Sequence, residues 1–119
     1  RIAMFQGPFE SEGVEANLAR LEGAAREAAG LGAGLLICPE MFLSGYAIGP
    51  ERVREAAEPI DGPSAVRAAA IACDAGIALL YGYPELGADG LVYNAALLLD
   101  RHGRRLAGAD RNGMAAERV

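Results

Sequence analysis

The feature that most constrains the fold is the run Leu35-Leu36-Ile37-Cys38, which ends in Pro39 and Glu40. Four apolar residues without alternation are typical of a strand that is covered on both faces, as in a parallel sheet. Pro39 has no backbone N–H to donate to a neighbouring strand and therefore ends this one. A carboxylate at the tip of a buried strand costs free energy unless it is paired, solvated or used in chemistry. Glu40 is therefore the first candidate for a functional residue.

The residues before this run predict a βαβ unit. Residues 1–6 resemble a strand, and from Val14 to Ala28 apolar residues recur at three- and four-residue steps, which predicts an amphipathic helix. A strand, a helix and a second strand at 34–38, within about forty residues, form a right-handed unit with parallel strands. Glu40 then lies at the carboxyl end of a parallel strand, where open α/β sheets place their ligand sites.

The rest of the chain predicts two more helices and three more strands. The expected helices are 51–57 and 64–75, and the expected strands are 77–83, 91–99 and 104–108. Short turns at 84–90 and 100–103 predict antiparallel pairing of the strands on either side of them. In helix 64–75 we expect Ser64 as the N-cap, with Val66 and Cys73 on the buried face, and we expect Glu85 to be a surface carboxylate.

Two substantial helices can cover only one face of such a sheet. A soluble monomer seldom exposes an apolar sheet face, so further chain or a partner should cover the other side. We therefore expect residues 1–119 to be a single partial domain within a larger assembly.

Charge and composition narrow the range of partners. The net charge is −5, and all eleven cations are arginine because the sequence contains no lysine. An acidic balance without a basic stripe argues against nucleic acid as a partner. No apolar run approaches the length of a membrane span, and the first strand leaves no room for a signal peptide. These features predict a cytoplasmic protein that does not bind membranes.

The two cysteines lack the spacing of a metal site or a redox motif. Cys38 and Cys73 stand in apolar surroundings, so we expect both to be buried, reduced thiols. His102, the single histidine, falls in a turn and is expected to be exposed. One histidine and two distant cysteines cannot assemble a metal centre, and no other sequence motif predicts a cofactor.

Seven short segments, taken in their order along the chain, carry a resemblance to a known family. They are Ile2–Gln6, Asn17-Leu18, Pro39–Tyr46, Asp61–Pro63, Gly82–Glu85, Tyr93–Ala95 and Asp100–Gly103. In this order they resemble the N-terminal part of the carbon–nitrogen hydrolase (nitrilase/amidase) superfamily. The Pro-Glu-x-Phe-x-Ser-Gly-Tyr segment is the most specific of them, and its continuation to Gly49 is similar to aliphatic amidases. Together the segments cover nearly the whole chain up to residue 108.

The resemblance implies an αββα sandwich, of which this chain would supply roughly the N-terminal half as a mixed sheet with helices on one face. It also implies a Glu-Lys-Cys mechanism, in which a thiolate attacks a small amide, a carbamoyl compound or a nitrile. The glutamate acts as general base and the lysine stabilises the oxyanion. The family's glutamate corresponds to Glu40. A homo-oligomer without a cofactor is the expected state.

The other two catalytic groups have no assigned place in this chain. A gapless count puts Arg111 at the lysine position, whereas in the alternative alignment the lysine segment is absent. The nucleophilic cysteine would lie beyond Val119, since Cys38 precedes Glu40 in one strand and Cys73 lies on a helix. The 119 residues alone are therefore expected to be inactive.

Three further residues are candidates for substrate binding. Tyr46 either lines the pocket or packs in its turn, and Tyr93 and Asn94 either form hydrogen bonds near Glu40 or serve the strand. The alternative for the whole protein is a non-catalytic family member that acts as a binding or assembly subunit. A small flavodoxin-like domain fits the βαβ start but not the two antiparallel turns.

Overall fold

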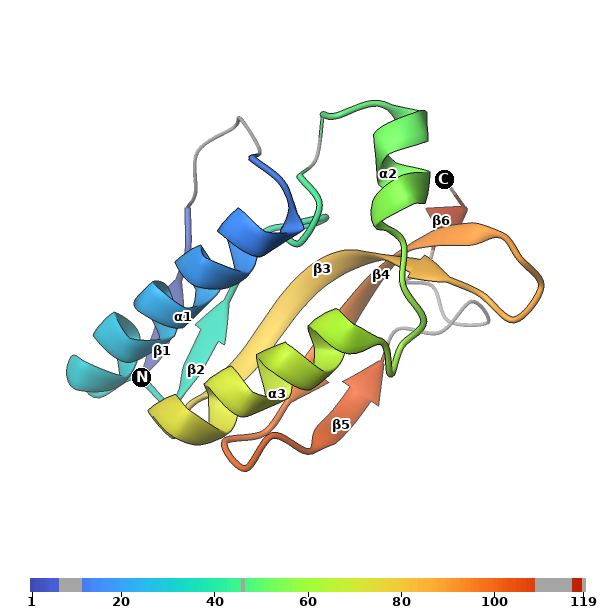
Figure 1. The fold of residues 1–119 in the computed structure, drawn as a ribbon. Helices are drawn as coiled ribbons and strands as arrows, with labels where there is room; N and C mark the ends of the chain where they lie inside the picture. Colours follow the sequence, from blue (N-terminus) through green and yellow to red (C-terminus); the bar gives the residue numbers. More distant parts are fainter. Residues whose placement is uncertain (7–11, 46, 109–116, 119) are drawn as a thin grey trace.

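The computed structural model describes residues 1–6, 12–45, 47–108 and 117–118. Its helices are α1 (Val14–Gly30), α2 (Pro50–Ala56) and α3 (Pro63–Ala75). Its strands are β1 (Ile2–Met4), β2 (Leu35–Ile37), β3 (Ala78–Leu86), β4 (Val92–Leu99), β5 (Arg105–Gly108) and β6 (Glu117–Arg118). Figure 1 shows α1 and α3 side by side across one face of a single sheet.

The sheet is mixed, as the sequence predicts. Its order is β1-β2-β3-β4-β5, with β6 also beside β4. The strands β1, β2 and β3 run parallel, whereas β4 is antiparallel to β3 and to β5. The parallel part confirms the βαβ unit, and the antiparallel part confirms the two turns that follow it.

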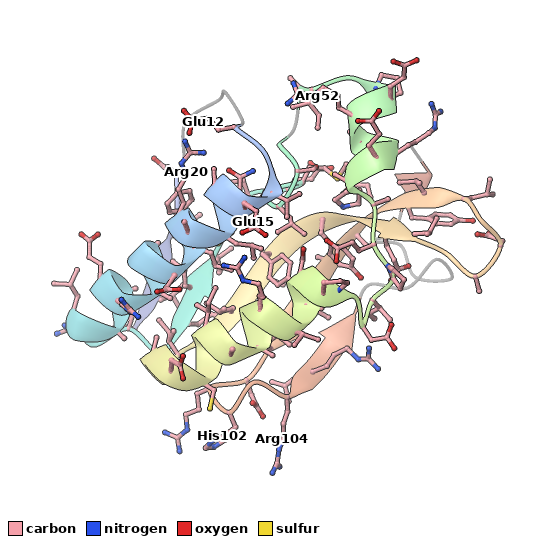
Figure 2. The ribbon with its side chains drawn as sticks, in the orientation of Figure 1. Glu12, Glu15, Arg20, Arg52, His102 and Arg104 are labelled. Carbon is pink, nitrogen blue, oxygen red and sulfur yellow. The ribbon has the colours of Figure 1, made fainter. Side chains whose placement is uncertain are left out.

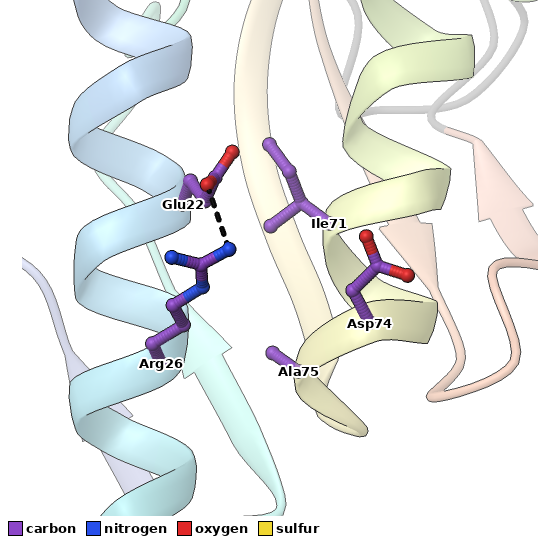
Figure 3. Close-up of a pocket in the computed structure, with 5 residues that line it drawn as sticks. All are labelled: Glu22, Arg26, Ile71, Asp74 and Ala75. Carbon is purple, nitrogen blue, oxygen red and sulfur yellow. Dashed lines mark ion pairs between the residues drawn. The ribbon is translucent and has the colours of Figure 1, made fainter.

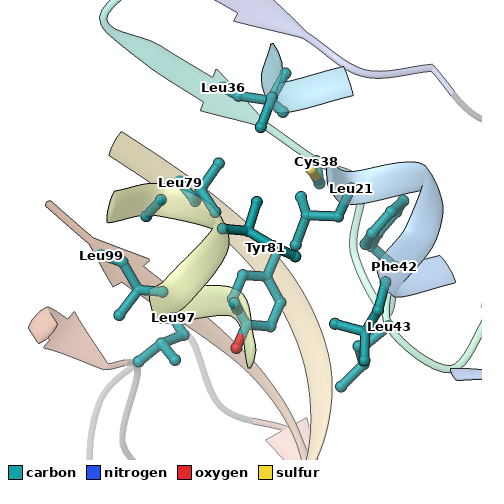
Figure 4. Close-up of a cluster of buried hydrophobic side chains, with 14 of the residues drawn as sticks. Leu21, Leu36, Cys38, Phe42, Leu43, Leu79, Tyr81, Leu97 and Leu99 are labelled. Carbon is teal, nitrogen blue, oxygen red and sulfur yellow. The ribbon is translucent and has the colours of Figure 1, made fainter. Parts of the chain in front are cut away.

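The hydrophobic core lies between the sheet and the two helices. Register pairs Leu36 with Leu79 and Leu79 with Leu99, so these leucines share the face toward the helices. Figure 4 shows this layer, where Leu21 of α1 and Tyr81 of β3 pack among the strand leucines. Burying such a side chain stabilises the fold by about 1.5–3 kcal/mol. The core therefore fixes which face of each strand points inward.

The residues that alternate with these form the opposite side of the sheet, which we name the open face. It carries Ile2, Met4, Leu35, Ile37, Leu80, Gly82, Asn94, Ala96 and Leu98. Ile2 and Met4 are 66% and 70% exposed. Since the two long helices, α1 and α3, both lie on the other side, the expectation that the two substantial helices would cover only one face is confirmed.

Helix α3 begins differently from the prediction. Gly62 is its N-cap and Pro63 its first residue, so the assignment of Ser64 as N-cap was wrong. The Glu58 carboxylate accepts hydrogen bonds from the Ser64 N–H (2.8 Å) and from the Ser64 hydroxyl. It thereby satisfies a backbone N–H group in the first turn of the helix, as an N-cap side chain would. The buried face is made by Ser64, Ala68, Ile71 and Ala72. Val66 is 65% exposed and Cys73 is exposed, which corrects the predicted helix face.

Strand β3 is longer than predicted and makes Glu85 a buried residue. It continues through Pro84, which is tolerated there because β2 has already ended opposite Leu80. Glu85 is 5% exposed, not the surface carboxylate that the sequence suggested, and it accepts a hydrogen bond from the Tyr83 hydroxyl at 2.9 Å. The Glu58 backbone takes the place of a neighbouring strand, bonding to Pro84 O (3.2 Å) and Leu86 N (2.8 Å).

Candidate active site

Glu40 lies at the carboxyl end of β2. The Cys38 N–H donates to Leu80 O at 2.8 Å, which is the last contact of this strand with β3 before Pro39 interrupts the ladder. Residues 40–44 form a turn, and the Glu40 side chain is exposed. Among the described residues, the candidate base therefore stands at the sheet edge where α/β folds place their ligand sites.

The turn that carries Glu40 rests directly on β3 at Gly82. A Cβ at Gly82 would lie 2.4 Å from the Met41 nitrogen and 2.9 Å from both Cα and the carbonyl carbon of Glu40. The Leu43 N–H donates to Gly82 O at 3.0 Å. Only a glycine allows the backbone of Glu40 and Met41 to approach the strand this closely. Sequence reasoning missed this role, although a glycine inside a strand is the signal that indicates such an approach.

Asn94 reaches Glu40 from the neighbouring strand. It lies on β4 opposite Pro84, next to the pair formed by Gly82 and Ala96. Its side-chain Nδ2 donates a hydrogen bond to Oε1 of Glu40. The structure thus brings together two residues of the predicted site, Glu40 and Asn94, that lie 54 positions apart in the sequence.

The other predicted site residues do not join this pair. The Tyr93 hydroxyl donates to Asp89 Oδ2 at 2.6 Å, and Tyr93 pairs with Glu85 in the register of the strands, so it faces the other side of the sheet. This geometry favours the structural alternative for Tyr93. Tyr46 and Arg111 lie outside the described residues.

The two cysteines differ in their surroundings. Cys38 is buried on the helix-facing side, and burial raises the pKa of its thiol to about 12. The prediction of a buried, reduced thiol is confirmed for Cys38. For Cys73 the reduced state is confirmed but the burial was wrong, because Cys73 lies outside the buried face of α3 and is exposed. A thiol needs to be deprotonated to act as a nucleophile, and Cys38 is therefore a poor one.

This difference predicts selective alkylation. At pH 8, iodoacetamide should modify Cys73 in the folded protein while Cys38 stays unmodified, because Cys38 is both inaccessible and protonated. Intact mass spectrometry should show one adduct on these two residues under native conditions and two in denaturant. Cys73→Ser should remove the native adduct. Alkylation of Cys38 at the rate seen in denaturant would contradict the placement of β2.

The turn between β4 and β5 is held by hydrogen bonds to Asp100. Figure 2 shows His102 and Arg104 projecting outward from the turn between β4 and β5, which confirms the expected exposure of His102. In that turn the Asp100 carboxylate accepts hydrogen bonds from the N–H groups of Arg104 (2.9 Å) and His102 (2.8 Å). These hydrogen bonds lower the pKa of the Asp100 carboxyl group, and the bond from Arg104 has the larger effect.

The residues described contain no cluster of histidine, cysteine or carboxylate groups suited to a metal ion.

A small groove on the outer surface is not a substrate pocket. Figure 3 shows it between α1 and α3, where Glu22 and Arg26 face Ile71, Asp74 and Ala75. It encloses about 10 Å³, which is room for roughly one water molecule. The Glu22–Arg26 ion pair, at 3.0 Å, forms one wall of this groove.

In the described part of the chain, no helix is both long and apolar enough to cross a membrane.

Residues 1–114 match the family model for carbon-nitrogen hydrolases. The chain belongs to this family. A curated relative, the hydrolase encoded in the pqqF 5′ region of Pseudomonas protegens, is 55% identical over 106 residues, which are 89% of this chain and 36% of the relative. The chain therefore spans about a third of the length of this relative.

The fold matches solved amidases of the nitrilase superfamily. An amidase from Nesterenkonia sp. superposes with a TM-score of 0.70 at 31% identity, over 92% of this chain and 41% of the amidase. One structure of a glutamate-to-glutamine variant of that amidase shows acrylamide added to its active-site cysteine, and another structure holds butyramide. An N-terminal amidase shares the fold at 19% identity and a TM-score of 0.72, over 90% of this chain and 26% of its own. The family resemblance and the mixed sheet predicted from the sequence are both confirmed.

Proposed function

We propose that this chain supplies the general base, Glu40, to a cysteine-dependent hydrolase that cleaves the carbon–nitrogen bond of small amides. The observation that carries the proposal is the exposed Glu40 carboxylate at the carboxyl end of β2, held by the Asn94 amide. Membership of the carbon-nitrogen hydrolase family supports the reaction class. The complexes of the Nesterenkonia amidase with acrylamide and with butyramide support small amides as the substrate class.

The proposed chemistry needs a base that first serves a thiol and then serves water. Glu40 takes the thiol proton as sulfur attacks the amide carbon, and this proton leaves with the amine when the C–N bond breaks. Glu40 then takes a proton from water, whose oxygen attacks the thioester carbon. The C–S bond breaks, the acid is released, and the proton on Glu40 returns to the thiolate. A lysine ammonium stabilises the oxyanion at both additions.

Neither described cysteine is suited to be the nucleophile. Cys38 is buried on the helix-facing side of the sheet and Cys73 lies on α3. In this proposal the nucleophile belongs to the part of the complete gene product outside residues 1–119, and the cation that stabilises the oxyanion is either Arg111 or a lysine outside these residues. The assay is release of ammonia from small aliphatic amides by that complete product, with Glu40→Gln as the variant that must lose it.

We also propose that residues 1–119 form a partial domain whose open face is covered in the complete protein, which itself forms homo-oligomers. Without that cover, the 119-residue chain should associate through its open face and exceed its mass of 12.3 kDa in light scattering. Met4→Glu on the open face should reduce association. The matched control is Val66→Glu, at a residue of similar exposure on α3, which should not change it. A monodisperse monomer of the unmodified chain would refute this proposal.

A non-catalytic binding or assembly subunit is the second candidate. The absence of lysine among the 119 residues favours it, because an oxyanion site built on arginine differs in reach and hydrogen-bond geometry. A complete gene product that binds amides but releases no ammonia would support this candidate over the hydrolase. The cytoplasmic location expected from the sequence is a proposal in either case.

A further inference from the structure

The turn after β2 has an uncommon backbone conformation next to Glu40. Met41 has φ of 53° and is the one non-glycine residue with positive φ in the described part of the chain. Such a backbone conformation persists only where its surroundings enforce it, and it is concentrated at functional sites. The conformation of Met41 therefore points to a constraint on its neighbour Glu40.

The contacts that enforce this conformation are all present. The Met41 side chain is buried against Val53 of α2 and Val92 of β4. The Gly45 N–H donates to Met41 O at 2.9 Å, which closes the turn on itself. On the β3 side, Gly82 allows the Glu40–Met41 peptide to approach the strand backbone more closely than a residue with a Cβ would permit. These contacts fix the Glu40 backbone on the open face without any contribution from the Glu40 side chain.

The side chain is then oriented by a neutral donor. Asn94 donates to Oε1 of Glu40, and no ion pair of Glu40 occurs among the described residues. An arginine would bond both carboxylate oxygens at once and hold the charge in place. One amide N–H group instead occupies a single oxygen and leaves the second one available to accept a proton. This arrangement suits a base better than it suits a structural carboxylate.

We infer that Asn94 is a positioning residue for proton transfer, which orients the Glu40 carboxylate on the turn that Gly82 and Met41 support. The inference rests on the proposed function of Glu40 as base. It differs from a substrate-binding role for Asn94, because the hydrogen bond that the Asn94 amide nitrogen donates goes to Glu40. It also differs from a packing role, because what matters is hydrogen-bond donation and not the shape of the side chain.

The test compares two variants of Asn94 in the complete gene product. Asn94→Asp keeps the shape but cannot donate to a carboxylate and adds a like charge, so kcat for amide hydrolysis should fall about 100-fold. Asn94→Ala removes the donor without adding repulsion, so kcat should fall about 10-fold. KM should stay within about twofold in both, since the lost interaction acts on the chemical step. The control is Ser64→Ala, which loses a hydrogen bond on the helix-facing side and should keep its kcat.

Each other outcome overturns the inference in a recognisable way. A packing role predicts that the isosteric Asn94→Asp is more active than Asn94→Ala, and a substrate-binding role predicts a raised KM at unchanged kcat. If Glu40→Gln is inactive while Asn94→Asp retains its kcat, positioning by Asn94 is wrong but the proposed function stands. If Glu40→Gln is itself active, the proposed function fails first.

Stability gives a second measurement should Asn94→Asp fold poorly. The double variant Glu40→Gln/Asn94→Asp exchanges the amide and the carboxylate, which restores a hydrogen bond between the two positions. Its thermal midpoint should be higher than that of Asn94→Asp, while the double variant remains inactive. Equal midpoints of Asn94→Asp and the double variant would show that the two side chains are not coupled, and would overturn the inference.

Discussion

Glu40→Gln in the complete gene product is expected to lower kcat for hydrolysis of a small aliphatic amide by about 10²–10⁴-fold, the range supplied by a general base. Glutamine keeps the size of the side chain but cannot take a proton from a thiol or from water. Because the Glu40 side chain is exposed, the variant should fold normally, with a thermal midpoint close to that of the unmodified protein. Ammonia release under saturating amide measures the effect.

A matched control separates the role of Glu40 from a general effect of removing a surface charge. Glu51 is an exposed carboxylate in the first turn of α2, and Glu51→Gln should retain normal turnover. A Glu40→Gln protein with normal turnover would exclude Glu40 as the base. If both the unmodified protein and Glu40→Gln release no ammonia, the non-catalytic candidate gains support.

The fold could be predicted to the extent that local pattern determined it. The unbroken apolar run Leu35–Cys38 and the helix from Val14 predict the parallel strands, and short polar turns predict the hairpins. The phase of α3 could not be predicted, since alanine stands at both buried and exposed positions of this helix, such as Ala68 and Ala70. Its start depends on Glu58, a carboxylate from the preceding loop whose position only the tertiary fold determines.

The candidate site also has residues that the sequence identifies and residues whose role depends on the tertiary fold. Pro39-Glu40 at the end of an apolar strand identifies the carboxylate from sequence, and the family resemblance places Asn94 in its vicinity. The role of Gly82 depends on register, because β3 must pass beneath the turn at that residue for its missing Cβ to matter. Pro84 suggested that the strand ends at residue 83, and so concealed the continuation of β3 to Leu86 and the burial of Glu85. The edge position that tolerates the proline becomes evident only once β2 is seen to stop.

Gly82→Ala is the substitution from which we expect the largest loss of stability. Its methyl group would lie 2.4 Å from the Met41 nitrogen and 2.9 Å from Glu40 Cα, closer than non-bonded atoms approach. Both neighbours are backbone atoms, so the clash cannot be relieved by rotating a side chain. Either the turn lifts from β3 or the strand bends, and we expect the free energy of unfolding to fall by about 3 kcal/mol, at the upper end for overpacking. Urea denaturation of the complete gene product measures this change.

The same substitution should also reduce activity, because moving the turn displaces the carboxylate that it carries. A displacement of about 1 Å in a reacting group can lower the rate about 100-fold, so kcat should fall by this order even where the variant remains folded. Gly23→Ala is the matched control. Gly23 lies inside α1 with no heavy atom within 4 Å of an added Cβ, so alanine there should stabilise the helix by about 1 kcal/mol and leave kcat unchanged. If Gly82→Ala were as stable and as active as Gly23→Ala, the turn would not rest on β3, and the support for the position of Glu40 would be lost.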